Sequence, residues 1–311
     1  MVETLGAYAQ GFFYAWNNHI YGIIAHMKII VLIIFILILL VVITSAVDNN
    51  RFITSEYSVS SPKVERDCRI AFLSDLHGNM HGKDNVKLIQ AVKNSDPDII
   101  VMGGDMITSR AGEVDKGKMQ IPILLAEAFG DRLVFYGMGN HEFRMYLYRE
   151  DFGNSFDELK KELESRGVHF LRNDRSVLDD MNIEIQGLEI ERKFYRRGRK
   201  ITMESSDLRK LIPQRDEKRY RILLAHNPEF FEAYSHEADL VLSGHFHGGI
   251  VRLPLIGGLV SARLSLFPKY DGGIYELNGS KMIVSRGLGS HTIPLRVFNP
   301  CELCIIDIRK E

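Results

Sequence analysis

Aspartate, histidine and asparagine residues stand at short spacings along this chain, in most cases beside a glycine. The groups are Asp75-Leu76-His77-Gly78-Asn79, Gly104-Asp105, Gly139-Asn140-His141-Glu142, His226-Asn227 and Gly244-His245-Phe246-His247-Gly248. Five of the eleven histidines of the chain belong to these groups. Carboxylate, imidazole and amide oxygen together suit Mn, Fe or Zn ions. The groups therefore predict a metal site.

The spacing also indicates how two cations could be held. Two cations about 3.5–4 Å apart need a ligand that contacts both, and a carboxylate with two oxygens can do this. Asp105 is the best candidate for the bridge, because it follows the middle one of three apolar segments. Residues i and i+2 lie on one side of a strand or turn, so Asp75 and His77 can reach one cation. His245 and His247 have the same spacing.

Each polar group follows a short apolar segment that is typical of a buried strand. The first three segments are residues 70–75, 98–105 and 132–140, with helical patterns at 85–93 and 119–129 between them. This β-α-β-α-β order predicts an α/β sheet covered by helices. A helix over 156–166 follows, and then the strand-like segments IEIQGL, YRILLAH, DLVLSGH, GIYEL, KMIVS and CELCIIDI. Ligands of open α/β sheets bind at the carboxyl ends of strands, where the polar groups lie.

At this point the residues resemble a known family. Asp-x-His, Gly-Asp, Gly-Asn-His-Glu, His and Gly-His-x-His, in this order, are similar to the motifs of calcineurin-like metallophosphoesterases. Further details resemble the bacterial membrane-associated, YkuE-like branch of that family: His-Asn-Pro, Leu-Ser-Gly-His-x-His-Gly-Gly and Ser-Arg-Gly-Leu-Gly. The resemblance covers residue 69 to the C-terminus. It implies an α/β fold in which two mixed sheets form a β-sandwich flanked by helices.

The resemblance also implies a role for each residue of the set. One divalent cation would be held by Asp75, His77 and His247, and a second by Asn140, His226 and His245, with Asp105 between them. Manganese is favoured, with iron or zinc as alternatives. A water or hydroxide between the cations would attack phosphorus in line. His141 would protonate the leaving oxygen or stabilise charge on it.

An uncharged apolar segment over residues 29–47 is the other prominent feature of the chain. Nineteen residues of helix measure about 28 Å, close to the roughly 30 Å hydrocarbon core of a bilayer. A buried core helix would show a polar stripe, and a signal peptide has a shorter apolar run after basic residues. We therefore expect one transmembrane helix. The aromatic residues before it (Phe12, Phe13, Tyr14, Trp16 and Tyr21) fit an interfacial segment over residues 1–28. Residues 48–66 are expected to be a linker, and 67–311 the catalytic domain.

Composition excludes some classes of protein. The formal net charge is −1, with 39 basic and 40 acidic residues, so no bulk positive field attracts nucleic acid.

Two further local features could indicate binding sites. Cys301 and Cys304 lie in a strand pattern and lack the second cysteine pair that a structural zinc site needs. One local exception is residues 192–200, RKFYRRGRK, which either form a solvated loop or bind anionic lipid or substrate.

The sequence as a whole predicts a membrane-anchored dimetal phosphohydrolase. Its substrate would be a phosphate ester or diphosphate, with lipid-linked esters among the candidates and no nucleic-acid partner. Two alternatives stay open: a nucleotide or nucleic-acid phosphodiesterase, and a non-catalytic membrane-tethered module on the same fold. The side of the membrane that holds the catalytic domain, and the oligomeric state, are left open.

Overall fold

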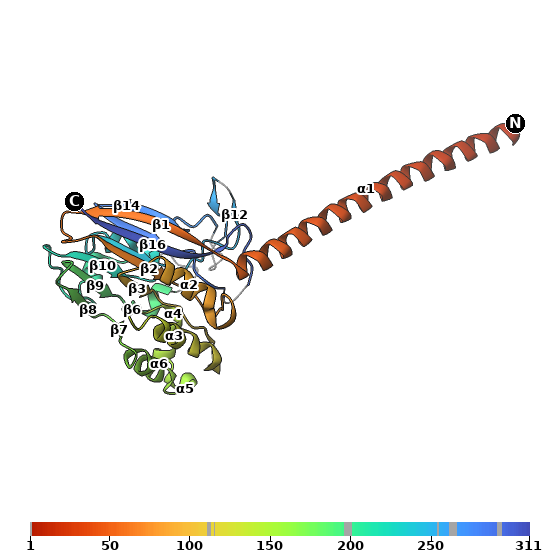
Figure 1. Ribbon diagram of the computed structural model, residues 1–311. Coiled ribbons are helices and arrows are strands. Elements are labelled where there is room, and N and C mark those ends of the chain that lie inside the picture. The colour runs from red at the N-terminus through yellow and green to blue at the C-terminus, as the bar shows by residue number, and fades with distance from the viewer. Residues whose placement is uncertain are drawn as a thin grey trace. The chain divides into compact units, whose positions relative to one another are not determined.

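The computed structural model describes residues 2–110, 113–114, 116–195, 201–253, 255–260, 266–290 and 294–311. The chain divides into two compact units, Met1–Ser45 and Ala46–Glu311. Most of the first unit is helix α1, Val2–Asn50, whose last residues belong to the second unit. Figure 1 shows α1 and the sheets of the second unit.

Helix α1 is continuous across the predicted boundary at residue 28. Within it, His19–Asn50 is long and apolar enough to cross a membrane, by length and composition alone. A signal sequence near the N-terminus would also meet those two conditions. The apolar side chains of residues 29–43 are exposed, and so are Trp16 and Tyr21. The side chains of residues 12–14 lie outside those that the structure describes.

The described part of the second unit contains two six-stranded sheets. The strand order of the first sheet is β1 (Phe52–Ser61), β16 (Cys301–Lys310), β2 (Cys68–Leu73), β3 (Ile99–Met102), β6 (Leu133–Gly137) and β7 (Val168–Leu171). The order of the second is β14 (Gly273–Leu277), β15 (Ser280–Val284), β11 (Leu240–Ser243), β10 (Tyr220–Leu224), β9 (Ile183–Gly187) and β8 (Arg175–Leu178). Both sheets are mixed, because β16 is antiparallel to β2, and β14 and β8 are antiparallel to their neighbours.

The predicted linker needs a correction, because its range contains strand β1. β1 pairs in parallel with β16 over its full length, from Phe52 opposite Cys301 to Ser61 opposite Lys310. Alternate side chains of β1 face inward, but one of them is Ser55, whose hydroxyl donates to Glu302 at 2.5 Å. An inward-facing serine breaks the apolar alternation by which a strand is recognised in sequence.

Side chains of the central strands point alternately to two different cores. Ile70 and Phe72 of β2 belong to a core between the two sheets, whereas Ala71 and Leu73 face helices. Strands that are buried on both faces read as continuous apolar runs, as they do here. The predicted β-sandwich of two mixed sheets flanked by helices is therefore confirmed.

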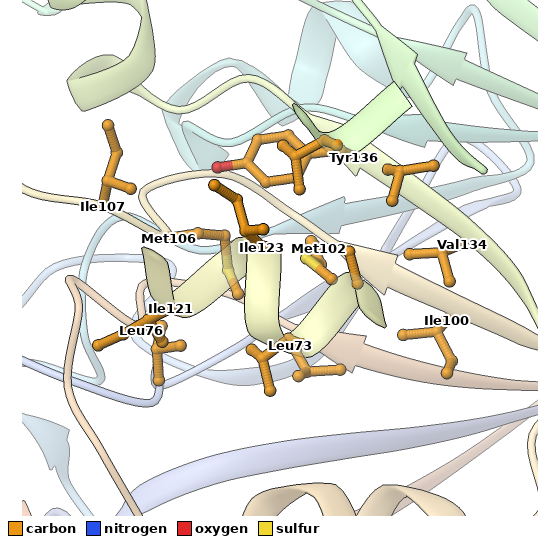
Figure 2. Close-up of a cluster of buried hydrophobic side chains, with 14 of the residues drawn as sticks. Leu73, Leu76, Ile100, Met102, Met106, Ile107, Ile121, Ile123, Val134 and Tyr136 are labelled. Carbon is orange, nitrogen blue, oxygen red and sulfur yellow. The ribbon is translucent and has the colours of Figure 1, made fainter. Parts of the chain in front are cut away.

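The helices on the outer face of the first sheet follow its strands in the chain. They are η1 (Lys83–Asn85), α2 (Val86–Asn94), α3 (Lys116–Ala128), α4 (Asn140–Leu147), α5 (Arg149–Phe152) and α6 (Ser155–Glu164). Figure 2 shows α3 over the core that faces the helices, with Ile121 near Leu76 and Ile123 near Met102.

Shorter elements complete the fold. The outer face of the second sheet is covered by η2 (Arg192–Tyr195), α7 (Ser205–Leu208), η3 (Pro228–Phe230) and α8 (Phe231–Tyr234). Two small hairpins are β4–β5 (Ser109–Arg110 and Glu113–Val114) and β12–β13 (Arg252–Leu253 and Gly257–Gly258). Cys301 and Cys304 are free and buried in β16.

Parallel pairing decides where the polar groups meet. β2, β3 and β6 are adjacent and parallel, so Asp75, Asp105 and Asn140 follow three strand ends at one edge of the first sheet. β10 and β11 are also adjacent and parallel, which brings His226 and His245 to one edge of the second.

Candidate metal centre

The turns that carry the predicted ligands have an uncommon backbone conformation. Five of the seven predicted ligands have φ between 50° and 72°: Asp75, His77, Asp105, His245 and His247. This left-handed region is sparsely used by residues other than glycine, and such residues concentrate at functional sites. The candidate ligands themselves therefore adopt the left-handed turn conformation, and not only the glycines beside them.

One group of side chains consists of Asp75, His77 and His247, all buried. The Nε2 atoms of His77 and His247 lie 3.2 Å apart, and Asp75 Oδ1 lies 3.4 Å from His247 Nε2. Asp75 Oδ1 is also 3.9 Å from His77 Nε2. Their ligand atoms fall within 4.8 Å of one another, as the residues that hold one cation must.

A second group consists of Asp105, His226 and His245. His226 Nε2 lies 3.2 Å from Asp105 Oδ2 and 3.6 Å from Asp75 Oδ1, so this imidazole faces both carboxylates. Asp105 Oδ2 is also 3.9 Å from His77 Nε2, in the first group. Asp105 thus lies between the two groups, where a bridging ligand is expected.

Hydrogen bonds on the far side of two imidazoles orient their free electron pairs. His226 Nδ1 donates to the carbonyl of Gly103 at 3.0 Å, and His247 Nδ1 donates to that of Gly289 at 3.0 Å. A neutral imidazole that carries its proton on Nδ1 presents an electron pair on Nε2. Metal-binding histidines are commonly held in this way by carbonyl groups behind them.

The electrostatics of the group favour a cation. Burial lowers the pKa of His226, but the carboxylates of Asp105 and Asp75 outweigh it and raise that pKa to about 10. Burial opposes ionisation of Asp105, yet His226 and His141 bring its pKa well below the usual range. Two buried carboxylates are costly unless positive charge balances them.

Two buried atoms test whether divalent cations fit. Among the described residues, His226 Nε2 and Asn140 Oδ1 are buried atoms with no hydrogen-bond partner. The raised pKa of His226 places a proton on Nε2 when no metal is bound, and a divalent cation can replace that proton between the ring and the carboxylate oxygens. Asn140 Oδ1 is a suitable amide-oxygen ligand. The donor set therefore fits divalent metal ions.

His141 adjoins both groups without repeating their hydrogen-bond pattern. Its Nδ1 lies 2.8 Å from the backbone nitrogen of Ser109 and 3.1 Å from the Ser109 carbonyl oxygen. The shorter contact favours the tautomer in which Nδ1 accepts and Nε2 carries the proton. Burial lowers the pKa of His141. The Asp105 carboxylate raises this pKa, and the Arg144 guanidinium lowers it. The rings of His141 and His77 pack edge to face with centroids 5.0 Å apart. His141 therefore presents an N–H at the edge of the site.

Glu142 is a supporting residue that the sequence prediction did not single out. Its buried carboxylate accepts from the backbone N–H groups of Asp105, Met106 and Gly139, at 2.9 to 3.0 Å, and from Tyr136 Oη at 2.7 Å. Burial and the Asp105 carboxylate raise the pKa of Glu142 to about 7, and hydrogen bonds from Tyr136 and from the Asp105 backbone oppose this rise. Glu142 thus joins the turns that carry Asp105 and Asn140. The Glu of the Gly-Asn-His-Glu motif was the available signal.

A cavity lined by two arginines opens beside Asn140. This cavity was not predicted from the sequence. Its volume is about 230 Å³, and its walls are Asn140, Phe143, Arg144, Leu147, Tyr148, Arg192 and Tyr195. Tyr195 packs on His245 with ring centroids 5.5 Å apart. In the described parts of the chain, neither arginine forms an ion pair. The basic segment that the sequence indicated begins at Arg192, and its residues 196–200 lie outside the described residues.

Gly244 shows how closely the site is packed. A Cβ atom at this position would meet Asp75 Oδ2 and Ser74 Oγ. We expect Gly244→Ala to displace the Asp75 carboxylate and to weaken retention of one metal by about tenfold, in the range for a disturbed supporting residue. Metal content after dialysis measures this. Gly130→Ala, whose Cβ would meet only two carbonyl oxygens at 3.6 Å, should match the native protein. Equal metal content in the two variants would contradict the prediction.

Comparison with known proteins identifies similar chains. Residues 68–249 match the family model for calcineurin-like phosphoesterase. An uncharacterized metallophosphoesterase of Aquifex aeolicus (strain VF5) is 29% identical over 82% of this chain and 90% of its own length. The uncharacterized metallophosphoesterase YkuE of Bacillus subtilis (strain 168) is 25% identical over 82% of this chain and 85% of its own.

A more distant relative has a named activity. The UDP-2,3-diacylglucosamine pyrophosphatase LpxG of Chlamydia muridarum is 24% identical over 76% of this chain and 82% of its own length. The chain spans 60% of the length of a further metallophosphoesterase, from Helicobacter pylori (strain J99).

Proposed function

We propose, from the premise that this chain belongs to the calcineurin-like phosphoesterase family, that it hydrolyses phosphate esters or diphosphates with two divalent cations at a membrane surface. The predicted family, its likeness to YkuE and the predicted class of phosphate-ester hydrolase are confirmed. The metals, the substrate and the attachment to a membrane are the parts that we add.

The position of His226 is the observation that carries the proposal. Its Nε2 faces Asp105 and Asp75 at 3.2 and 3.6 Å, while its Nδ1 proton is held by the Gly103 carbonyl. Two carboxylates inside a protein need positive charge beside them, which the protonated His226 ring supplies without metal and divalent cations would supply when bound. This arrangement supports a metal-dependent enzyme over a non-catalytic module, for which no such balance of charges would be needed.

The predicted ligand set supports two cations. Asp75, His77 and His247 would hold one, and Asn140, His226 and His245 the other, with Asp105 shared. We propose manganese as the first metal to test, with iron and zinc as alternatives. When bound, two such cations would supply Lewis acidity that polarises the phosphoryl group and lowers the pKa of the attacking water.

The protein groups around this set have separate roles in the proposal. The backbone N–H of His141 donates to Asp105 Oδ1 at 2.7 Å and holds that carboxylate in place. The backbone N–H of His245 does the same for Asp75, at 3.0 Å. His141 Nε2–H would donate to the leaving oxygen as negative charge develops on it.

The arginine-lined cavity supports a substrate with a second anionic group. Arg144 and Arg192 would bind that group, because guanidinium matches phosphate geometry with paired donors. The relative LpxG is named for hydrolysis of a diphosphate that carries acyl chains. We infer that a diphosphate, lipid-linked in the leading version of the proposal, is a better substrate here than a simple monoester. The near-neutral net charge argues against nucleic acid.

We also propose that α1 anchors the enzyme to a membrane. The segment His19–Asn50 is long enough to span a bilayer, and its apolar side chains have no protein core to bury them in the described structure. An anchored enzyme would meet substrates that are themselves held in the membrane.

The proposal is tested with the full chain purified in detergent. Its rate is measured with Mn²⁺ and with a chelator, on p-nitrophenyl phosphate, a phosphodiester, a nucleotide, single-stranded DNA and a lipid diphosphate. We expect metal-dependent hydrolysis, fastest on the diphosphate. Hydrolysis that persists after complete metal removal would contradict the dimetal mechanism, and a clear preference for DNA would favour the nuclease alternative.

Arg192 offers a sharper test of the cavity. Arg192→Gln should raise KM for a diphosphate by about tenfold, since a charge-assisted hydrogen bond contributes about 1.5 kcal/mol and 1.4 kcal/mol is tenfold. Its kcat on p-nitrophenyl phosphate should be unchanged. Lys193→Gln is the matched control, because Lys193 is exposed and pairs with Glu191 at 2.8 Å. If both variants behave alike, the cavity does not bind the second anionic group.

A further inference from the structure

Five large apolar side chains are exposed together at one edge of the second unit. We call this set the apolar tip; its members are Leu255, Ile256, Leu266, Phe267 and Phe298. Leu255 is as exposed as in an extended peptide, at 107%, and the other four are 61% to 70% exposed. Single exposed apolar residues are ordinary, but a contiguous group marks a contact surface.

The members of the apolar tip come from three loops that are tied together. Leu255, Ile256 and Phe298 line one hollow. The Phe267 N–H donates to the Leu259 carbonyl at 2.9 Å, which holds the loop of Leu266 and Phe267 next to β13. The loops therefore present one surface.

Three members of the apolar tip have a backbone conformation that is strained for bulky residues. Leu255, Phe267 and Phe298 have φ of 68°, 47° and 53°. Bulky residues rarely adopt this left-handed conformation, and strain of this kind persists where function requires it. The three side chains project into solvent. We therefore infer that a contact with a partner outside this chain accounts for the strained conformation.

The apolar tip lies where the apolar segment of the chain joins the domain. The buried carboxylate of Asp48 accepts from the backbone N–H of Asn299 at 2.8 Å, and Phe298 is the preceding residue. Asn49 Nδ2 donates to the Pro294 carbonyl at 3.0 Å. The apolar segment of α1 ends at Val47, one residue before Asp48. Phe298 is thus held beside the residue at which a membrane-spanning segment would end.

We propose that the apolar tip inserts into the leaflet from which α1 emerges, so that the domain has a second contact with the same membrane. The occupant is a lipid monolayer, because the adjoining chain is the segment suited to span one. Arg51, whose side chain is 58% exposed and pairs with Asp48, supplies positive charge at the height of anionic headgroups. The inference rests on the proposed anchoring by α1.

This contact would also bear on the metal site. Asn299, next to Phe298, donates through Nδ2 to the backbone carbonyl of His247 at 2.7 Å. Arg296 donates to the Gly289 carbonyl at 2.7 Å, and that carbonyl also accepts from His247 Nδ1. The loop that carries Phe298 therefore supports a predicted metal ligand. A tip seated in lipid would hold the site close to headgroup phosphates.

The experiment places a fluorescent label at the apolar tip in the full chain. Leu255→Cys, and separately Phe298→Cys, carries an environment-sensitive dye, and the native cysteines are buried and therefore unreactive. The protein is reconstituted into vesicles of phosphatidylcholine and phosphatidylglycerol with doxyl-labelled lipid as quencher. Val177→Cys on β8 is the control. Val177 is 38% exposed, and strand β8 is drawn far from strand β12 in Figure 1. Hydrolysis of p-nitrophenyl phosphate verifies that each variant is folded.

We expect the labels at 255 and 298 to be quenched several-fold more strongly than the label at 177. Equal quenching at all three positions, in protein that floats with the vesicles, would overturn the second contact and leave the anchor and the phosphohydrolase intact. A blue shift at 255 without quenching would show that a second copy or another protein covers the tip, which also overturns the proposal. Protein that does not float with the vesicles would refute the anchor itself, whatever the labels report.

Discussion

Asp105→Asn is expected to abolish metal-dependent hydrolysis, with kcat falling by about 10³-fold or more. Asp105 lies between the two groups of predicted ligands, 3.2 Å from His226 and 3.9 Å from His77. An amide cannot bridge two cations as a carboxylate does. The loss of several kcal/mol of charge stabilisation corresponds to about that factor, at 1.36 kcal/mol for each tenfold change. The measurement is kcat on p-nitrophenyl phosphate at saturating Mn²⁺, together with metal content.

The fold of Asp105→Asn should survive. The asparagine Oδ1 can still accept from the His141 backbone N–H, and its Nδ2 can donate to the electron pair of His226 Nε2. With a chelator present, the melting temperature should fall below that of the native protein, because the folded state lowers the pKa of Asp105 and so favours its charged form beside His226. Native protein alone should gain stability from Mn²⁺. Asp131→Asn, at a side chain that is 72% exposed, is the matched control. Full activity in Asp105→Asn would refute the bridging role.

Most strands that carry the site could be predicted from sequence for a physical reason. β2, β3, β6, β10 and β11 are buried on both faces, so each contains a short apolar run without alternation, followed by a polar turn. Arg69 and Arg221 precede the apolar runs of β2 and β10. β1 has no such run, because it is an edge strand with serines on both faces. Its place in the sheet depends on pairing with β16, from the opposite end of the chain, which local pattern does not reveal.

The supporting residues of the site were harder to predict than the candidate ligands. Ligand types are restricted by chemistry, so Asp75, His77 and Asp105 stand out by type and spacing. Glu142 acts on backbone N–H groups, and any carboxylate in a polar motif could do this. Asn299 holds the His247 carbonyl across 52 residues of sequence. Such contacts depend on loop geometry. The left-handed turns at the candidate ligands could not be predicted either, because they occur at aspartate and histidine and not at glycine.

Helix α4 is a related case. The strand-like segment that the sequence predicts over residues 132–140 includes Asn140, yet a helix begins at Asn140 itself. Asn140 and His141 therefore occupy its first turn, and their side chains diverge because neighbouring helical positions point in different directions. The Asn140 side chain can then serve as a metal ligand while the His141 side chain faces the substrate.

His141→Ala should slow hydrolysis of an alkyl phosphate by about 10²–10³-fold, within the range for loss of a positioned proton donor. The loss should be much smaller for p-nitrophenyl phosphate, whose leaving group departs as a stable anion and needs little help. The reason is the tautomer that the shorter Nδ1 contact favours: Nδ1 accepts from the Ser109 N–H at 2.8 Å, which leaves Nε2–H for the leaving oxygen. The kcat values of both esters and the bound metal are measured on the same preparation.

Metal content separates this role from the alternative that His141 is a ligand. Its ring nitrogen lies within 4.8 Å of ligand atoms of His77 and Asp105, close enough for either role. If His141→Ala keeps its full complement of metal and loses activity in proportion to the basicity of the leaving group, His141 is the proton donor. If it loses metal as Asp105→Asn does, and slows both esters equally, the donor role is wrong. His236→Ala, at an exposed histidine remote from both groups in sequence, should change neither quantity.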